Sequence, residues 1–249
     1  MGQLIAVANT KGGVGKSTLS VHFTRAVMAR GYDVALIDTD PQQSAADWFE
    51  QAKKRPHVER LPLINLEGTG NWIMKSRPLI ARMDLVIVDF PSVVTAAIGA
   101  ACLTADVLVI PTQLSEMDLR STARTLAIAS RARKTRPNGL PRIVIVPNRV
   151  RPADERLELL SHLVPPKDTK IADPLPEDDR FSNGHAKGRD RRDETMTAEW
   201  MEPFHALVET VERELRSSAE AKTGESGAAE WPIMRPSRRP WWRRILRSA

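Results

Sequence analysis

The sequence predicts an α/β fold: a three-layer, doubly wound and mostly parallel sheet with helices on both faces. Five short apolar runs recur along the chain, and stretches long enough for helices separate them. Strands that alternate with helices form right-handed crossover units, which give a parallel sheet. The chain has 249 residues, 41% of them hydrophobic, which is enough for one such domain with a sizeable core.

The expected elements follow from the spacing of apolar residues and from the glycines and prolines between them. The expected strands are short runs rich in Val, Ile and Leu, at residues 4–8, 33–38, 85–88, 107–110 and 143–146. Helices are expected at about 17–30, 43–54, 72–82, 93–103, 116–134 and 198–216.

Composition divides the chain into a folded domain, a linker and a tail. Residues 1–216 carry the expected strands and helices. Residues 217–230 are small, polar and poor in apolar side chains, so we expect a flexible linker there. Residues 231–249 hold six arginines, three of the six tryptophans and no acid. The net charge of +6 therefore belongs to this basic Arg/Trp-rich tail, and residues 1–230 are formally neutral.

Several classes of protein are disfavoured by the composition. The chain has no apolar run near the roughly 18 residues of a membrane-spanning helix, and its start does not resemble a signal peptide. Its single cysteine, Cys102, excludes an intrachain disulfide and lies in a small apolar run, so we expect it in the core. The five histidines lack metal-ligand spacing, which argues against structural zinc. A cytoplasmic protein is expected.

A glycine-rich segment follows the first expected strand: Lys11-Gly12-Gly13-Val14-Gly15-Lys16-Ser17. Its glycines let successive backbone N–H groups turn inward around phosphate oxygens, and the following helix favours an anion at its N-terminus. Lys16 would reach the β and γ phosphates, and the Ser17 hydroxyl would bind Mg²⁺. The strand before the loop and the helix after it are the setting that such a loop needs. A nucleotide site with Mg²⁺ is therefore expected.

The loop departs from the usual Walker A pattern, because Thr10 occupies the place of the first glycine and Lys11 is an additional lysine. This form resembles the deviant Walker A loop of the ParA/MinD family of partition and positioning ATPases, over roughly residues 1–210. The resemblance implies a P-loop NTPase that hydrolyses ATP and forms a homodimer on ATP binding. Lys11 would then reach across the dimer and stabilise charge on the transferring phosphoryl group, as an arginine finger does.

Three aspartates at strand ends extend the resemblance. Residues 38–42 read D-x-D-P-Q, as in the ParA branch, and Asp38 and Asp40 face the same way at alternate strand positions. They would lie beside the loop if the first and second strands are neighbours. By the resemblance, Asp40 positions the attacking water and Asp38 supports the metal. Asp89 ends the third expected strand and is the Walker B candidate, binding Mg²⁺ together with Ser17.

Two later segments complete the expected nucleotide site. Asn148 follows the fifth strand, where family members contact adenine; the alternative is a loop cap. Residues 176–178 and Gly188 resemble the P-E-D…G segment of the MinD branch, which packs near the base. The expected catalytic residues are Lys11, Lys16 and Asp40, and the expected metal ligands are Ser17, Asp38 and Asp89. The expected nucleotide contacts are Lys11, Gly12, Gly13, Val14, Gly15, Lys16, Ser17, Thr18, Asn148 and Pro176.

Two further segments leave alternatives open. Residues 111–119 resemble the family's P-T-x-P-S-x-x-D-L segment, with Leu114 in place of a proline, and fit either a dimer face or a plain strand-to-helix loop. A basic stretch after the fifth helix fits either a solvated face or part of a DNA-binding surface. Its members are Arg131, Arg133, Lys134, Arg136 and Arg142.

The tail mixes bulky apolar and cationic residues. On a helix, Trp242, Ile245 and Leu246 would share one face, as in a peptide that lies in a membrane interface. The arginines would equally suit anionic lipid or the phosphates of DNA, and a tail without a partner is the third alternative.

The preferred interpretation is a ParA-like ATPase that positions a plasmid, chromosome or other cargo. Its ATP-bound dimer would bind nonspecific DNA on the nucleoid, and a ParB-like or cargo-adaptor protein would stimulate its weak hydrolysis. The alternative is a MinD-like peripheral membrane ATPase recruited through residues 231–249. A third possibility is a scaffold that uses ATP only as a dimer clamp.

Overall fold

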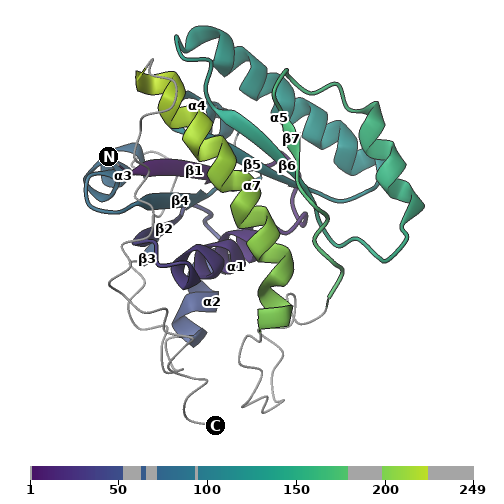
Figure 1. Ribbon diagram of the computed structural model, residues 1–249, viewed down its shortest axis with the longest axis horizontal. Helices are drawn as coiled ribbons and strands as arrows, with labels where there is room; N and C mark the ends of the chain where they lie inside the picture. Colours follow the sequence, from purple (N-terminus) through teal and green to yellow (C-terminus); the bar gives the residue numbers. More distant parts are fainter. Residues whose placement is uncertain (1, 53–62, 66–71, 93–94, 179–197, 224–249) are drawn as a thin grey trace.

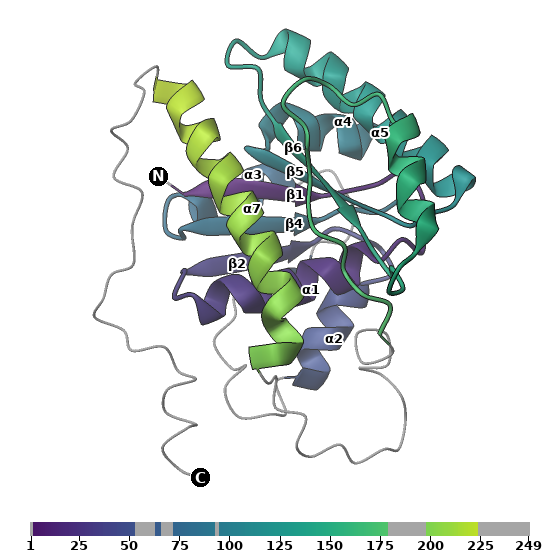
Figure 2. The same ribbon diagram turned by 45° about the vertical axis from the view of Figure 1, so that its right-hand side comes forward.

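The protein folds into three layers, with a parallel sheet between two layers of helices (Figures 1 and 2). The computed structural model describes residues 2–52, 63–65, 72–92, 95–178 and 198–223. Within these ranges the sheet has seven strands in the order β3-β2-β4-β1-β5-β6-β7, and every strand pair in it is parallel. The predicted fold class is therefore confirmed.

All five predicted strands are present. They are β1 (Gln3–Val7), β2 (Val34–Asp38), β4 (Leu85–Asp89), β5 (Val107–Thr112) and β6 (Arg142–Pro147). The prediction missed β3 (Leu63–Asn65) and β7 (Lys170–Ile171), which form the two edges of the sheet. Both are too short to show an apolar periodicity of their own.

Six helices match the predicted stretches to within a few residues, except at the C-terminal end of the last one. They are α1 (Lys16–Ala29), α2 (Ser44–Ala52), α3 (Trp72–Ile80), α4 (Thr95–Thr104), α5 (Glu116–Thr135) and α7 (Ala198–Thr223). A 3₁₀ helix, η1 (Glu155–His162), was not predicted. Within the described ranges, none of the helices is both long and apolar enough to cross a membrane.

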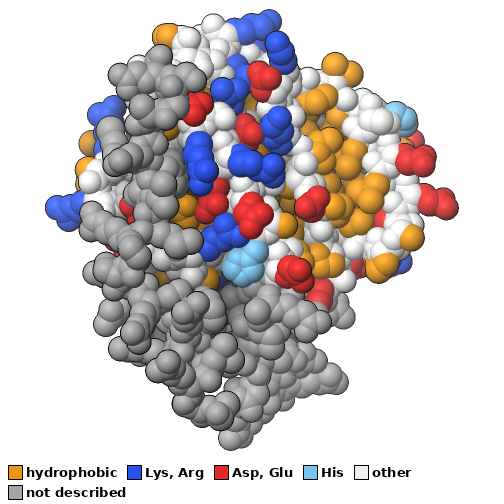
Figure 3. Space-filling model, viewed as in Figure 1, with side chains coloured by type: hydrophobic (Ala, Val, Ile, Leu, Met, Phe, Trp, Pro, Cys, Tyr) orange, Lys and Arg blue, Asp and Glu red, His pale blue; other side chains and the backbone are white. Residues whose placement is uncertain are grey.

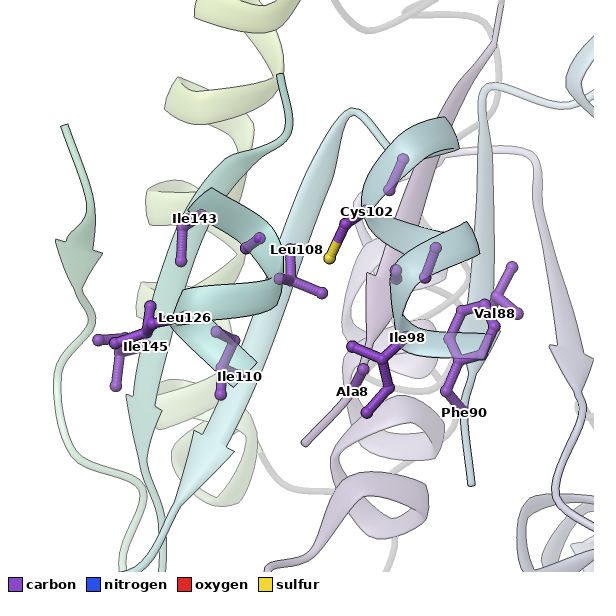
Figure 4. Packing of buried hydrophobic residues seen from close by; sticks show 14 of the residues in the cluster. Ala8, Val88, Phe90, Ile98, Cys102, Leu108, Ile110, Leu126, Ile143 and Ile145 are labelled. Carbon is purple, nitrogen blue, oxygen red and sulfur yellow. The ribbon is translucent and has the colours of Figure 1, made fainter. Parts of the chain in front are cut away.

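Side chains of each strand alternate between two cores, one on each face of the sheet. Leu4 and Ala6 of β1 pack with the core that includes α3, α4 and α5, whereas Ile5 and Val7 pack with the core that includes α1, α2 and α7. Cys102 lies in the first core, beside Leu108 and Ile98 (Figure 4). It is fully buried, and this burial raises the pKa of its thiol to about 12, as expected for a core residue.

Helix α7 continues through Thr223, seven residues into the segment 217–230 that was predicted as a linker. Tertiary contacts explain this difference. Ser218 is buried and donates a hydrogen bond to Asp106 at 3.3 Å, and Lys222 lies 2.5 Å from the same carboxylate. Asp106 thereby holds the last turns of α7 against the sheet. The rest of the predicted linker and the tail at 231–249 lie outside the described residues.

Candidate nucleotide-binding site

The glycine-rich loop connects β1 to α1 at the carboxyl end of the sheet. Gly13 and Gly15 have φ angles of 77° and 93°, in the left-handed region that favours glycine. A Cβ atom on Gly15 would lie 2.2 Å from Nδ2 of Asn148. The first turn of α1 contains no acid, and its N-cap makes no side-chain hydrogen bond. The loop and the helix N-terminus therefore leave backbone N–H groups available to an anion.

Lys16 lies inside the loop, with only 6% of its surface exposed. Its ammonium donates a hydrogen bond to the carbonyl of Lys11 at 3.2 Å. Burial lowers the pKa of Lys16, and the nearby carboxylates of Asp89 and Asp40 oppose this shift. The structure therefore brings Lys16, Asp40 and Asp89 into one electrostatic cluster.

The side chain of Lys11 lies outside the loop. Its ammonium is 2.6 Å from Oδ1 of Asp118, whose side chain is 4% exposed, compared with 32% for Lys11. Ser115 caps α5 and donates a short hydrogen bond to the other oxygen of Asp118. Residues 111–119, which the sequence left open between a dimer face and a loop, thus contain the partner of Lys11.

One face of α5 holds the first half of the loop. Thr122 accepts a hydrogen bond from the Asn9 side chain at 3.2 Å, and Thr125 accepts one from the backbone N–H of Thr10 at 3.1 Å. The hydroxyl of Thr10 donates to the carbonyl of Ser121 at 3.0 Å. Together with Asp118, these residues recur every three or four positions, so they share one side of the helix.

Asp89 is fully buried at the end of β4, beside the loop. Its Oδ1 accepts a hydrogen bond from Ser20 at 3.1 Å, whereas Oδ2 accepts none from the residues that the structure describes. Burial raises the pKa of Asp89 to about 7, and the nearby hydroxyl of Ser17 opposes the shift. A buried carboxylate oxygen without a donor, next to a serine hydroxyl, is the type of ligand that Mg²⁺ takes. Ser17 and Asp89 therefore fit the predicted metal site.

Asp38 lies farther from the loop than the sequence suggested, because β4 lies between β1 and β2. The condition that the first two strands are neighbours is not met. Asp38 is paired in register with Asp89, and its two oxygens accept hydrogen bonds from the backbone N–H groups of Asp40, Ala45 and Ala46 at 3.0–3.1 Å. Asp38 therefore caps the start of α2, and burial raises its pKa.

The two predicted base-pocket segments lie side by side. Asn148 donates a hydrogen bond from its side chain to the carbonyl of Val14 at 2.8 Å, so it supports the loop directly. Pro176 forms a parallel bridge with Val150, two residues beyond Asn148. An open pocket borders this region and includes Arg149 and Glu177 in its lining. Gly188, the other end of the resemblance, lies outside the described residues.

Sequence reasoning missed several residues that hold the loop. Gln113 donates a hydrogen bond to the carbonyl of Gly13 at 3.1 Å. Asn9 is fully buried and also donates to the carbonyl of Pro111 at 2.8 Å. These contacts join residues about a hundred positions apart. The only available signal was the resemblance of 111–119 to a family segment.

Fold and loop together define an α/β protein of the P-loop nucleotide-binding class. The chain belongs to the CobQ/CobB/MinD/ParA nucleotide binding domain family, whose model matches residues 5–190. The predicted family is therefore confirmed.

Curated relatives include proteins that distribute carboxysomes. The chain is 31% identical over 134 residues to the maintenance of carboxysome distribution protein A of Halothiobacillus neapolitanus, which covers 53% of this chain and 61% of that protein. It is 28% identical over 129 residues to the protein ParA of Rhizobium radiobacter, covering 50% of this chain and 55% of that protein. The chain thus spans less than two thirds of the length of these relatives.

Solved structures with the same fold include three relevant proteins. Apo McdA of Cyanothece superposes with a TM-score of 0.62 at 19% identity, over 85% of this chain and 100% of that one. A plasmid partition protein of Borrelia burgdorferi bound to AMPPNP superposes with a TM-score of 0.63 at 17% identity, over 86% of this chain and 100% of that one. MinD of Pyrococcus horikoshii with Mg-ADP superposes with a TM-score of 0.63 at 18% identity, over 86% of this chain and 97% of that one. At these identities the likeness shows the shared fold.

Proposed function

We propose that this protein is a ParA-like ATPase that positions a plasmid, a chromosome or another cargo. It binds ATP with Mg²⁺, forms a homodimer in that state, and binds DNA without sequence preference. A ParB-like or cargo-adaptor protein stimulates its hydrolysis and releases the dimer. Such a protein works in the cytoplasm, at the nucleoid.

The observation that carries this proposal is that the two lysines of the loop, Lys11 and Lys16, lie in different surroundings. Lys16 is buried in the loop, near enough to Asp89 for that carboxylate to affect its pKa, and would bind the phosphates of its own nucleotide. Lys11 is partly exposed on the outer side of the loop and has an ion pair with Asp118 instead. A second cation at this position is available to the nucleotide of another subunit, where it would stabilise charge on the transferring phosphoryl group.

The three aspartates of the site have different roles in the proposed hydrolysis. Asp89 and Ser17 hold Mg²⁺, which neutralises charge on the phosphates when it is bound. Asp40 is partly exposed at the start of the loop after β2, close enough to Lys16 to affect its pKa, and positions the attacking water. Asp38 orients the segment that carries Asp40, because its Oδ1 accepts the backbone N–H of Asp40. Its support of the metal is indirect, through this segment.

The enzymatic part is tested by ATP turnover of the wild type and of Asp40→Ala and Lys11→Ala. Both variants should lose at least about tenfold in turnover, since each removes a group that acts in the transition state. The turnover of the Lys11→Ala variant should also depend less on protein concentration than that of the wild type. Equal turnover in Asp40→Ala and wild type would remove Asp40 from its assigned role. A wild type that dimerises with ATP but does not hydrolyse it would favour the alternative of a scaffold that uses ATP only as a dimer clamp.

The surface on which the protein works is tested by co-sedimentation with random-sequence DNA and, separately, with anionic liposomes. Each is measured with ATP and with ADP, using full-length protein and residues 1–230. ATP-dependent DNA binding supports the proposal. Binding to liposomes alone, and only with the tail present, would replace it by the MinD-like alternative.

A further inference from the structure

Helix α5 has two polar faces in addition to its buried apolar side. The first face, defined by Asp118, Thr122 and Thr125, holds the nucleotide loop. The second face looks away from the protein. It carries a row of exposed cations, Arg120, Arg124, Arg131 and Lys134, which we call the α5 basic stripe.

The spacing of the α5 basic stripe places its members on one side of the helix. Positions 120, 124, 131 and 134 follow the three- and four-residue repeat, and Ala123 and Ala127 between them are also exposed. At 1.5 Å per residue, the stripe extends over about 21 Å. Small alanines leave the cations accessible along this whole length.

Three of the four cations are uncompensated. Arg120 lies 3.4 Å from Glu116, but Arg124, Arg131 and Lys134 form no ion pair with the described part of the chain. Beyond Asp118, α5 contains no further acid. The stripe is therefore a row of positive charge on a helix whose opposite side is buried.

The structure also separates this stripe from the other cations of the basic stretch found in the sequence. Arg133 donates to the carbonyl of Gly139 at 2.8 Å, and Arg136 donates to the carbonyl of Ala105 at 2.6 Å. Arg142 lies 3.9 Å from Asp168. These three side chains support the fold, so only Arg131 and Lys134 of that stretch remain free to bind a partner.

The face over α7 differs from the stripe. Lys and Arg side chains alternate there with Asp and Glu (Figure 3). Arg30, for example, lies 2.9 Å from Glu209 and 3.1 Å from Glu212 of α7. Mixed charges of this kind neutralise each other and attract a polyanion weakly.

We propose that the α5 basic stripe is the surface that binds the phosphate backbone of double-stranded DNA, an inference that rests on the proposed function. Cations in a row over about 21 Å suit a duplex, which carries one negative charge per roughly 1.7 Å of its axis. A membrane suits the stripe less, because Leu119 and Leu126 of α5 are buried in the core and cannot enter lipid, which leaves Met117 as the exposed large apolar side chain of this helix. Contacts to phosphates alone explain binding without sequence preference. The same helix holds Lys11 and the nucleotide loop on its other face.

The test compares full-length wild type with the triple variant Arg124→Ala/Arg131→Ala/Lys134→Ala. A matched control, Lys75→Ala/Arg77→Ala/Arg82→Ala, removes the same charge from exposed positions on and after α3. Binding to a random-sequence duplex is measured by fluorescence anisotropy with ATP at several salt concentrations. The stripe variant should bind at least about tenfold more weakly, and its plot of log affinity against log salt should lose about 3 from its slope. The control should stay within about twofold of wild type.

Two results would overturn this assignment while leaving the proposed function intact. One is a stripe variant that binds DNA as the control does. The other is a stripe variant that loses binding to anionic liposomes but keeps binding to DNA. If wild type itself does not bind DNA with ATP, the proposed function fails instead. ATP-dependent dimerisation, measured in parallel, should be equal in all three proteins and shows that the variants are folded.

Discussion

The ammonium of Lys11 lies 2.6 Å from the buried carboxylate of Asp118 in its own chain. A lysine that serves another subunit's nucleotide has to leave this partner first. In the proposed ATP-bound dimer the ion pair would therefore compete with dimer formation, and its strength would set part of the free energy that ATP binding has to supply.

Asp118→Asn should increase ATP-dependent dimerisation. The asparagine keeps the shape of the side chain near Ser115 but removes the charge that holds Lys11. A partly exposed ion pair contributes about 1 kcal/mol, and each of the two subunits would break one, so the dimer dissociation constant should fall about thirtyfold. Sedimentation velocity with ATP measures it. In a Lys11→Ala background the same substitution should have no effect, and a weaker dimer in Asp118→Asn would contradict the competition.

Asp89→Asn should separate the stability of the free protein from nucleotide binding. The pKa of Asp89 is raised to about 7 by burial, so the free fold is destabilised as pH rises from about 4 through about 7. At pH 8, asparagine should raise the free energy of unfolding by up to about 4 kcal/mol. The variant should also lose the stabilisation of about 2.7 kcal/mol that wild type gains from Mg²⁺·ATP at a hundred times its dissociation constant. Urea unfolding with and without Mg²⁺·ATP checks both effects, and an unchanged gain would exclude Asp89 as a ligand.

Asn148→Ala tests the two roles of that side chain. Its Nδ2 supports the loop through the carbonyl of Val14, and its oxygen accepts no hydrogen bond from the described residues. The oxygen is thus available to the amino group of adenine. Binding of ATP should weaken about tenfold, and the preference for ATP over GTP should shrink. Calorimetric titration with both nucleotides measures this. If the binding of ATP and of GTP weakens equally, Asn148 acts only by supporting the loop.

The burial of His22 should make the stability of the fold depend on pH. It lies between Trp48 and Phe204, and burial lowers its pKa to about 3. Because the unfolded chain takes up a proton near pH 6.5 and the folded protein does not, stability is present above that pH and is lost as pH falls towards 3. His22 should account for about 2 kcal/mol lost between pH 7 and 5. The unfolding free energy of His22→Gln should fall by that much less over the same range, and parallel curves for the two proteins would refute the assignment.

The sequence by itself determined the features that depend on neighbours along the chain. The five central strands are apolar runs, and the loop at 11–17 has its glycines and lysine at fixed spacing. Both signals are local, so the fold class, the nucleotide loop and the position of Asp89 at a strand end could be predicted before the structure was known.

Only the tertiary structure decided which distant residues meet. It inserted β4 between β1 and β2, so that Asp38 caps α2 and Asp89 faces the loop. It paired Lys11 with Asp118 and extended α7 through contacts to Asp106. Strand order and buried ion pairs depend on side chains about a hundred residues apart, and no local periodicity reports them. The same packing divided the basic stretch of the sequence into cations that support the fold and cations that remain on the surface.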